Sequence, residues 1–187
     1  MSKKTNKRNH LKIIGGKWKG RKVTFTDASG LRPTLTRTRE TLFNWLRPYI
    51  TDSTVLDLFA GSGSLGFEAI SHGAINLTFV EIDRSTLQHL KSQTALFDQN
   101  ITAIKGDAIN FLNQTNKTFD IIFLDPPYKE NKLPMLIDHI FQEKILKKDG
   151  IIIIHRHKKE NDKFSNNLKI LDEKKYGISK ILFGKLN

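Results

Sequence analysis

The stretch from Val55 to Gly66, with the sequence VLDLFAGSGSLG, constrains the fold more than any other part of the chain. It opens with an apolar run from Val55 to Leu58, which predicts a buried parallel strand. Glycines at positions 61, 63 and 66 follow in the pattern G-x-G-x-x-G. Glycine adopts positive φ angles and lets a ligand lie against bare backbone. The stretch therefore predicts a strand, a turn and a helix of the kind that binds nucleotides in α/β proteins.

Predicted strands and helices alternate through most of the chain. We expect strands at 54–58, 76–81, 101–105, 119–124 and 150–155, and helices at about 64–72, 85–97, 107–114 and 132–147. The sequence Ser85-Thr-Leu-Gln88 predicts a capping box at the start of the second helix. Residues 168–173 and 179–183 predict a closing antiparallel hairpin. The alternation indicates a Rossmann-like α/β fold with a doubly wound, mostly parallel sheet.

The chain before this alternation is strongly basic. No Asp or Glu occurs between Met1 and Thr26, and the whole chain carries a net charge of +12. We expect a basic disordered tail at 1–10, an N-terminal extension at 11–50 with strands at 11–14 and 21–25 and a helix from Thr34 or Thr36, and the main α/β unit at 51–187. Such a charge favours an anionic partner, with nucleic acid ahead of a membrane. A biased genome composition also explains the total charge, but it explains the acid-free N-terminal segment less well.

Cysteines and membrane-spanning segments are both missing from the sequence. The chain has no Cys, which excludes disulfides, zinc-thiolate sites and a thiol nucleophile. No apolar stretch approaches the ~20 residues that a membrane helix needs, and the polar start at 1–10 does not resemble a secretory signal. We therefore expect a cytoplasmic protein with no membrane partner and no metal site. Its 187 residues fit one domain, and a monomer is the simplest assembly.

Two acidic residues follow the glycine loop at the ends of predicted strands. Glu81 ends the strand at 76–81, and a carboxylate there can accept hydrogen bonds from two ribose hydroxyls. Asp107 follows the strand at 101–105, where it can accept from the exocyclic amine of adenine or simply cap the next helix. The loop has no Lys beside its last glycine, so it is not a Walker A phosphate loop. The pattern fits a ligand with an adenosine group and requires no triphosphate.

The sequence Asp125-Pro-Pro-Tyr128 follows the strand at 119–124, which lies beside the first strand in this topology. The prolines fix φ and leave carbonyl oxygens as acceptors, while Asp125 adds a carboxylate and Tyr128 a flat ring. Acceptors beside a ring suit the amino group of a nucleobase. Hydrogen bonds from that amine to Asp125 and the Pro126 carbonyl would make its lone pair more available. Stacking on Tyr128 would then align the nitrogen with a sulfonium methyl group.

The glycine loop and the Asp-Pro-Pro-Tyr sequence together resemble the S-adenosylmethionine-dependent amino-methyltransferases of nucleic acids. Three further segments narrow the resemblance: Ile13–Lys22 (IIGGKWKGRK), Gly30–Thr34 (GLRPT) and Arg39–Leu46 (RETLFNWL). With them, the chain resembles the bacterial methyltransferase family that modifies the N2 of a guanine in 16S ribosomal RNA. The resemblance implies a class I methyltransferase fold and S-adenosylmethionine as the cofactor. It also implies 16S rRNA as the partner, within the small ribosomal subunit or one of its assembly intermediates.

The resemblance implies roles for individual residues as well. The cofactor positions are Asp57, Phe59, Gly61, Ser62, Gly63, Glu81, Asp107 and Ala108. The catalytic positions are Asp125, Pro126, Pro127 and Tyr128. The resemblance further implies that the segment around Arg32, Arg37 and Arg39 faces RNA or the lid of the cofactor pocket. From the acid-free N-terminal segment, we expect Lys17, Lys19 and Arg21 to face RNA as well. The sequence departs from the family pattern at Thr36, where Asp is usual, at Thr38, where an aliphatic residue is usual, and at His155, where Glu is usual.

Three other functions stay open on the sequence. A DNA adenine-N6 methyltransferase uses the same loop, but such enzymes usually carry a target-recognition domain, for which 187 residues leave little room. A nicotinamide-dependent oxidoreductase fits the glycine loop and Glu81 but gives no reason for Asp125. A non-catalytic RNA-binding assembly factor on this fold would not need either acid. The function we predict is methyl transfer to a guanine N2 of 16S rRNA.

Overall fold

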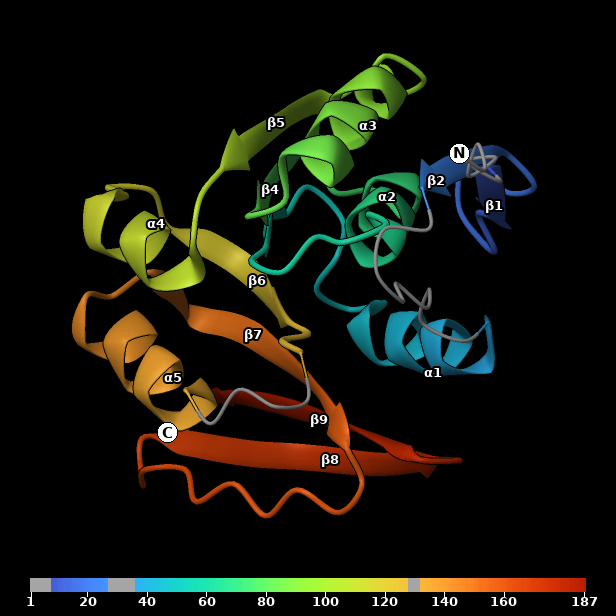
Figure 1. Cartoon of the computed structure of the whole chain (residues 1–187). Helices are drawn as coiled ribbons and strands as arrows, with labels where there is room; N and C mark the ends of the chain where they lie inside the picture. Colours follow the sequence, from blue (N-terminus) through green and yellow to red (C-terminus); the bar gives the residue numbers. More distant parts are fainter. Residues whose placement is uncertain (1–7, 27–35, 128–131) are drawn as a thin grey trace, which may run out of the picture.

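The computed structural model of the protein describes residues 8–26, 36–127 and 132–187. Its main sheet has seven strands, and β1 and β2 form a separate two-stranded sheet (Figure 1). The strands are β1 (Arg8–Lys12), β2 (Lys22–Thr26), β3 (Thr54–Asp57), β4 (Asn76–Glu81), β5 (Asn100–Lys105), β6 (Phe119–Leu124), β7 (Leu146–His157), β8 (Leu168–Tyr176) and β9 (Ser179–Leu186). The helices are α1 (Thr36–Leu46), α2 (Ser64–Ser71), α3 (Arg84–Thr94), α4 (Ala108–Gln114) and α5 (Leu133–Gln142).

The order of the strands, β5-β4-β3-β6-β7-β9-β8, places a topological switch point between β3 and β6. From β3 the chain moves outward through β4 to β5 and then returns to the other side of β3, where β6 pairs with it in parallel. β7 continues the parallel sheet, and the antiparallel strands β9 and β8 complete it. This topology confirms the predicted Rossmann-like fold with a C-terminal hairpin. In such sheets ligands bind at the carboxyl ends of the strands beside the switch point.

Helices cover both faces of the sheet. Successive side chains of a strand point to opposite faces, so each face of the sheet has its own apolar core. Val55 and Phe123 belong to an apolar core that includes residues of α1, α2 and α3. Their neighbours Leu56 and Ile122 belong to a second core, with residues of α4 and α5. Figure 1 shows α4 and α5 on one side of the sheet and α1 and α2 on the other. Burial on both faces explains why the central strands are apolar along most of their length.

The β1–β2 hairpin packs on α2 and α3 and shares the first of these cores. Val23 and Phe25 of β2 are buried in the same cluster as Phe67 of α2. The ring of Trp18 stands edge-on to the ring of Phe97, with 5.2 Å between the two centroids. Aromatic pairs in this geometry contribute about 0.5–1.5 kcal/mol beyond the area that they bury. The N-terminal extension is therefore packed into the main α/β unit through apolar contacts.

A glycine lets the turn of this hairpin approach the end of α2. Gly16 has a φ of 72°, and a Cβ atom at this position would lie 1.8 Å from the carbonyl oxygen of Ser71. The backbone N–H of Lys17 donates to that carbonyl at 2.8 Å, and the N–H of Trp18 donates to the Ser71 hydroxyl at 3.0 Å. Any side chain at position 16 would separate these partners, so the turn requires glycine here.

The helix predicted at 132–147 is shorter than expected. α5 ends at Gln142, and β7 already begins at Leu146. Lys144 has a φ of 53°, and the N–H of Ile145 donates back to the carbonyl of Ile140 at 2.9 Å. This is the geometry of a Schellman motif, which usually has glycine at the left-handed position. Because lysine occupies that position here, the sequence carries no visible stop signal.

The start of α3 also differs from the prediction of a capping box at Ser85. The cap is Asp83, whose carboxylate accepts from the N–H of Thr86 at 2.7 Å, and the helix begins at Arg84. This hydrogen bond lowers the pKa of Asp83, because it favours the charged carboxylate. Asp and Ser are both good N-caps, so the two positions compete on sequence alone. The structure selects the residue that directly follows the turn after β4.

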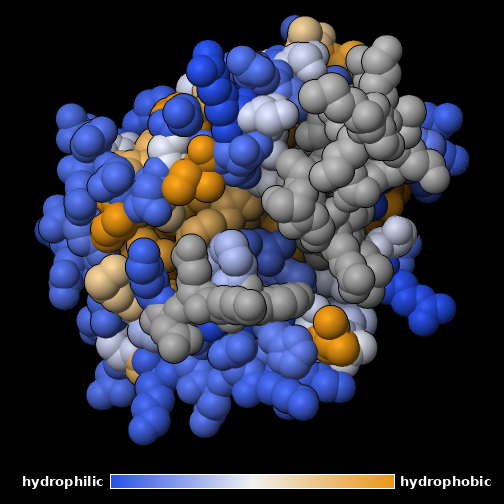
Figure 2. Space-filling model, in the orientation of Figure 1, coloured by the Kyte–Doolittle hydropathy of each residue, from blue (hydrophilic) through white to orange (hydrophobic). Residues whose placement is uncertain are grey.

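The surface is dominated by hydrophilic side chains. Figure 2 shows them gathered over β8, the edge strand, where Lys169, Lys174 and Lys175 are exposed. Charged residues along an edge strand discourage pairing with another chain. Among the described residues, no helix is both long enough and apolar enough to cross a membrane.

Candidate cofactor and base-binding site

The chemistry-bearing side chains meet at the carboxyl ends of four neighbouring parallel strands. Along the sheet from β4 through β3 and β6 to β7, these side chains are Glu81, Asp57, Asp125 and His155. The register pairs Leu124 of β6 with Ile154 of β7, so the next residues of the two strands, Asp125 and His155, lie side by side. This edge of the sheet is where the topology predicts a ligand.

Backbone N–H groups of the glycine loop bind the acids at the ends of β3 and β4. The N–H of Gly61 donates to Glu81 Oε2 at 2.8 Å, and the N–H of Gly66 donates to Asp57 Oδ2 at 3.2 Å. Gly61 and Gly63 have φ angles of 50° and 74°, which favour glycine. The second oxygen of Glu81, Oε1, accepts from the N–H of Asp83 at 2.8 Å. Glu81 therefore fixes both the loop and the start of α3 while its carboxylate stays partly accessible.

The carboxyl group of Asp57 is buried among other acids. Burial raises the pKa of Asp57, and the charges of Asp125 and Glu81 raise it further. Hydrogen bonds from the N–H groups of Gly66 and Phe59 oppose the shift, and the resulting pKa is about 8. Asp57 is therefore mostly protonated at pH 7, which avoids a buried negative charge beside the partly exposed carboxylate of Asp125.

The structure places the remaining cofactor candidates around the same loop. Asp107 caps α4, since its Oδ1 accepts from the N–H of Ile109 at 3.0 Å. The capping interpretation of Asp107 is confirmed, and its contact with adenine stays a prediction. Ser62 and Ala108 are buried, and Phe59 is partly buried against the core under α4 and α5.

The segment after β6 presents the predicted catalytic acid at the surface of the site. The side chain of Asp125 is 29% exposed, while Pro126 is buried and Pro127 is exposed. The fixed φ of each proline limits how far this segment can move. Tyr128, predicted to stack on the target base, lies outside the described residues, as does Arg32.

His155 is a site residue that the sequence marks only as a departure from the family pattern near the end of a strand. Its Nδ1 lies 2.8 Å from Asp125 Oδ1, and its side chain is 12% exposed. Burial by itself lowers the pKa of His155, but the hydrogen bond and the charge of Asp125 outweigh burial, so the pKa is raised overall. The signal in the sequence was its place near the end of the strand beside Asp125.

Most of the basic residues predicted to face RNA are on the surface. Lys17, Lys19 and Arg21 are exposed on the turn of the hairpin, and Arg37 is exposed on α1. Lys17 Nζ lies 4.7 Å from the centroid of the Trp18 ring, a cation–π distance. Lys17, Lys19 and Arg21 therefore make the turn of the hairpin a basic surface, while the Trp18 side chain belongs to the buried core.

Arg39 is the exception, because its side chain points into the protein. The residue is 3% exposed. Its Nη1 donates to Glu68 Oε2 at 3.0 Å and to the Lys12 carbonyl at 3.2 Å. Glu68 is fully buried and also accepts from the N–H groups of Ile14 and Gly15, at 3.0 and 2.9 Å. The expectation that Arg39 faces RNA is corrected: Arg39 joins α1, α2 and the hairpin.

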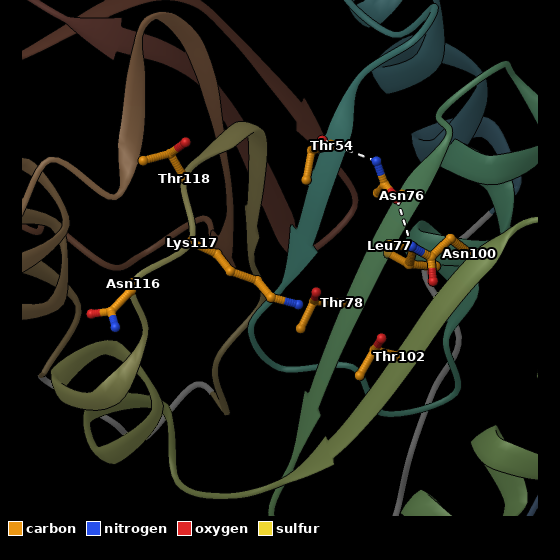
Figure 3. Close-up of a pocket in the computed structure, with 9 residues that line it drawn as sticks. All are labelled: Thr54, Asn76, Leu77, Thr78, Asn100, Thr102, Asn116, Lys117 and Thr118. Carbon is orange, nitrogen blue, oxygen red and sulfur yellow. Dashed lines mark hydrogen bonds between the residues drawn. The ribbon is translucent and has the colours of Figure 1, made fainter.

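A groove of about 420 Å³ lies at the opposite, amino-terminal edge of the sheet (Figure 3). Its lining is mostly Thr and Asn, and Asn76 accepts from Asn100 Nδ2 at 2.8 Å. Lys117 is the one charged side chain among the lining residues. The groove contains none of the predicted site residues and lies away from the switch point.

The chain matches the family model described as "Conserved hypothetical protein 95" over residues 11–185. Two curated relatives are named "Ribosomal RNA small subunit methyltransferase D". The relative from Haemophilus influenzae is 39% identical over 178 residues, which cover 92% of each chain. The relative from Escherichia coli is 42% identical over 145 residues, which cover 77% of this chain and 73% of the relative.

The chain belongs to the ribosomal RNA small subunit methyltransferase D family. The solved structure of yhhF from Escherichia coli supports the same grouping, with a TM-score of 0.86 at 36% identity. The match covers 95% of this chain and 98% of that chain. The family therefore spans the N-terminal hairpin as well as the main sheet.

Proposed function

We propose that the protein transfers the methyl group of S-adenosylmethionine to the exocyclic N2 of guanine 966 in 16S ribosomal RNA. Its family makes it a ribosomal RNA methyltransferase, and the proposal adds the base and the atom. The observation that carries the proposal is the Asp125 carboxylate. This carboxylate is partly exposed at the switch point, two strands from Glu81. Neighbouring strands lie ~4.8 Å apart, so the two acids are separated by roughly 10 Å.

The residues present fit the cofactor. Glu81 uses one lone pair of each oxygen for a backbone N–H and can still accept from two ribose hydroxyls. Asp107 follows β5, the strand next to that of Glu81. Its Oδ1 caps α4, which leaves Oδ2 to accept from the amine of adenine. Gly61 adds no side chain to the loop, and Gly63 lets the loop pack closely on α2 and α3, since a Cβ there would lie 2.6 Å from a ring carbon of Phe67. When bound, S-adenosylmethionine supplies a methyl group activated by its sulfonium centre.

Asp125 and the carbonyl of Pro126 act on the target amine. The lone pair of an exocyclic amine is delocalised into the base, so the nitrogen is a weak nucleophile. Two acceptors that bind its N–H groups favour a pyramidal nitrogen with a more available lone pair. The nitrogen then gains the methyl group and loses one proton, which Asp125 is placed to accept. Tyr128 is assigned the stacking contact that aligns the base, so positioning supplies most of the acceleration.

The basic surface of the hairpin serves the RNA. Lys17, Lys19 and Arg21 on the hairpin and Arg37 on α1 are exposed and can neutralise phosphates, and we assign Arg32 to RNA from its sequence alone. RNA is recognised mostly by shape and through unpaired bases, which suits a small protein without a separate recognition domain. We therefore assign the small ribosomal subunit, or an assembly intermediate of it, as the substrate.

The test is methyl transfer from labelled S-adenosylmethionine to small ribosomal subunits that lack their own modification. Naked 16S RNA and duplex DNA run in parallel, and nuclease digestion identifies the labelled base. We expect label in N2-methylguanosine, at guanine 966, from the subunit or its assembly intermediate. Label in N6-methyladenine would keep the role of Asp125 but replace the substrate. Tight cofactor binding with no transfer to any RNA would refute the proposed reaction.

A further inference from the structure

The pair formed by Asp125 and His155 joins two neighbouring strands at the point where the target amine would bind. His155 Nδ1 lies 2.8 Å from Asp125 Oδ1, which leaves Oδ2 as the second acceptor of the carboxylate. An ionised carboxylate accepts hydrogen bonds and donates none, so Nδ1 carries the hydrogen in both charge states of the imidazole. The contact therefore holds one oxygen of Asp125 whether or not His155 is charged.

We propose that His155 is a positioning residue of the transfer reaction, which turns the Asp125 carboxylate so that Oδ2 faces the target amine. The inference rests on the proposed function. Without such a hydrogen bond, the carboxylate of an Asp rotates over a broad range of χ2. A hydrogen bond to one oxygen restricts that rotation, and a fixed acceptor needs no reorganisation during the reaction.

The groups around the pair leave this role to His155. Asp57 lies on the neighbouring strand β3, where it is buried and mostly protonated at pH 7, and Glu81 lies one strand further. On the other side, β9 faces His155 with the apolar Ile181. On the same sheet face, α1 carries the exposed charges of Arg37 and Glu40, and α2 carries Glu68, which pairs with Arg39. Among the described residues, His155 is the basic side chain that hydrogen bonds to Asp125.

The charge of His155 then sets how strongly Asp125 can act. The imidazolium form partly neutralises the carboxylate and weakens its attraction for the positive charge that develops on the amine. The neutral form keeps the hydrogen bond without this loss. Because Asp125 raises the pKa of His155 above its ordinary 6.5, we expect kcat to rise with pH through an inflection above that value.

Two substitutions separate the hydrogen bond from the charge. In His155→Asn, the amide Nδ2 occupies the place of the imidazole Nδ1, since both are bonded to Cγ, so the donor is kept but no longer titrates. In His155→Leu, a side chain of similar reach has no donor. His157→Asn on the same strand is the matched control; in the wild type, the Nδ1 of His157 accepts from the backbone N–H of Lys159.

The assay is multiple-turnover methyl transfer to the small subunit at saturating substrates between pH 5.5 and 9, which gives kcat, with the cofactor Kd measured separately. A hydrogen bond to a charged group corresponds to a roughly tenfold to hundredfold change in rate. We expect His155→Leu to lose kcat by about this factor at unchanged cofactor Kd. His155→Asn should recover most of kcat but lose the inflection, and His157→Asn should match the wild type in both.

Two results would overturn the inference while the proposed function stands. One is wild-type kcat in His155→Leu with normal cofactor binding. The other is an inflection that persists unchanged in His155→Asn. Circular dichroism and a urea transition establish that each variant is folded, and the titration of His155 by NMR gives a readout independent of turnover. If the wild-type protein itself transfers no methyl group to RNA, the proposed function fails, and the NMR titration still decides whether His155 and Asp125 are paired.

Discussion

Replacing Arg39 by Ala tests how the N-terminal hairpin is held to the main sheet. Arg39 is 3% exposed, and its guanidinium donates to fully buried Glu68 at 3.0 Å and to the carbonyl of Lys12 at 3.2 Å. Burial lowers the pKa of Arg39, and the charge of Glu68 opposes that shift. The side chain stays charged, since an arginine in a protein does not lose its proton. Truncation therefore leaves a buried carboxylate without its counter-charge.

The size of the effect follows from what Glu68 keeps. Removing one partner of a buried ion pair costs about 3–5 kcal/mol of unfolding free energy. Glu68 still accepts from the N–H groups of Ile14 and Gly15, and His72 Nε2 lies 3.3 Å from its Oε1. These partners place the expected loss at the lower end, about 3 kcal/mol. For a urea m-value of about 2 kcal/mol/M, the midpoint of unfolding falls by roughly 1.5 M.

The matched control is Arg37→Ala, two positions earlier on the same helix, where the side chain is exposed. Surface substitutions of this kind change the unfolding free energy by about 0.5 kcal/mol or less. Urea unfolding of both variants, followed by tryptophan fluorescence and circular dichroism, gives the comparison. Salt-dependent RNA binding, measured on the folded proteins, is the second readout. Wild-type stability in Arg39→Ala, together with a salt slope shallower by about 0.7–0.9, would show that Arg39 contacts phosphate and would refute the assignment.

Three further predictions concern the site and its RNA surface. Asp125→Asn should lower the rate of methyl transfer at least a hundredfold, because groups that stabilise developing charge contribute roughly this much and an amide is a weaker acceptor than a carboxylate. The cofactor Kd should stay unchanged, and retained turnover would contradict the role of Asp125. Charge reversal at Lys17, Lys19 and Arg21 should weaken RNA binding and flatten its dependence on salt, which a titration across salt concentrations measures. The folded pKa of Asp57 is about 8 against an ordinary 3.8, so folding takes up a proton between these values and the unfolding free energy should fall as pH rises through that window. Asp57→Asn should lose the part of this pH dependence that comes from Asp57. If the urea midpoints of Asp57→Asn and the wild type depend on pH in the same way, Asp57 is not protonated in the folded protein.

Local patterns in the sequence were sufficient to predict the frame of the site. Each of these patterns depends only on residues that are close in the sequence: the apolar run at 55–58, the glycines that follow it, and Glu81 at the end of its own strand. Each prediction needs only that parallel strands end at the same edge of the sheet. The hydrogen bond from Gly61 to Glu81 at 2.8 Å joins these two signals. These patterns do not show which oxygens of an acid bind the protein itself and which stay available to a ligand. Asp107 is an example, because its Oδ1 accepts from the N–H of Ile109.

The direction of an arginine could not be predicted in the same way. Arg37 and Arg39 lie two positions apart on α1, and both are charged, long and flexible. Their difference depends on Glu68, which lies 29 positions after Arg39 and is buried because α2 packs on the sheet. The residues around Glu68 are apolar on every side of α2, which indicates a buried helix, but they do not show which cation pairs with Glu68. The net charge therefore predicts a basic surface, but it does not show that Arg39 is buried and absent from that surface.

The pairing of Asp125 with His155 depends on strand register, which no local pattern contains. β7 begins at Leu146, four residues before the strand predicted at 150–155, and its register against β6 shifts between Phe119 and Ile121. A slip of one residue would move every side chain of β7 to the opposite face and would set Ile154 or Arg156 beside Asp125, depending on its direction. The apolar run of β7 is buried on both faces and tolerates either register by hydrophobicity alone. The antiparallel pairing of His155 with Ile181 on β9 fixes the strand on its other side, so the C-terminal hairpin helps to decide which β7 side chain meets Asp125.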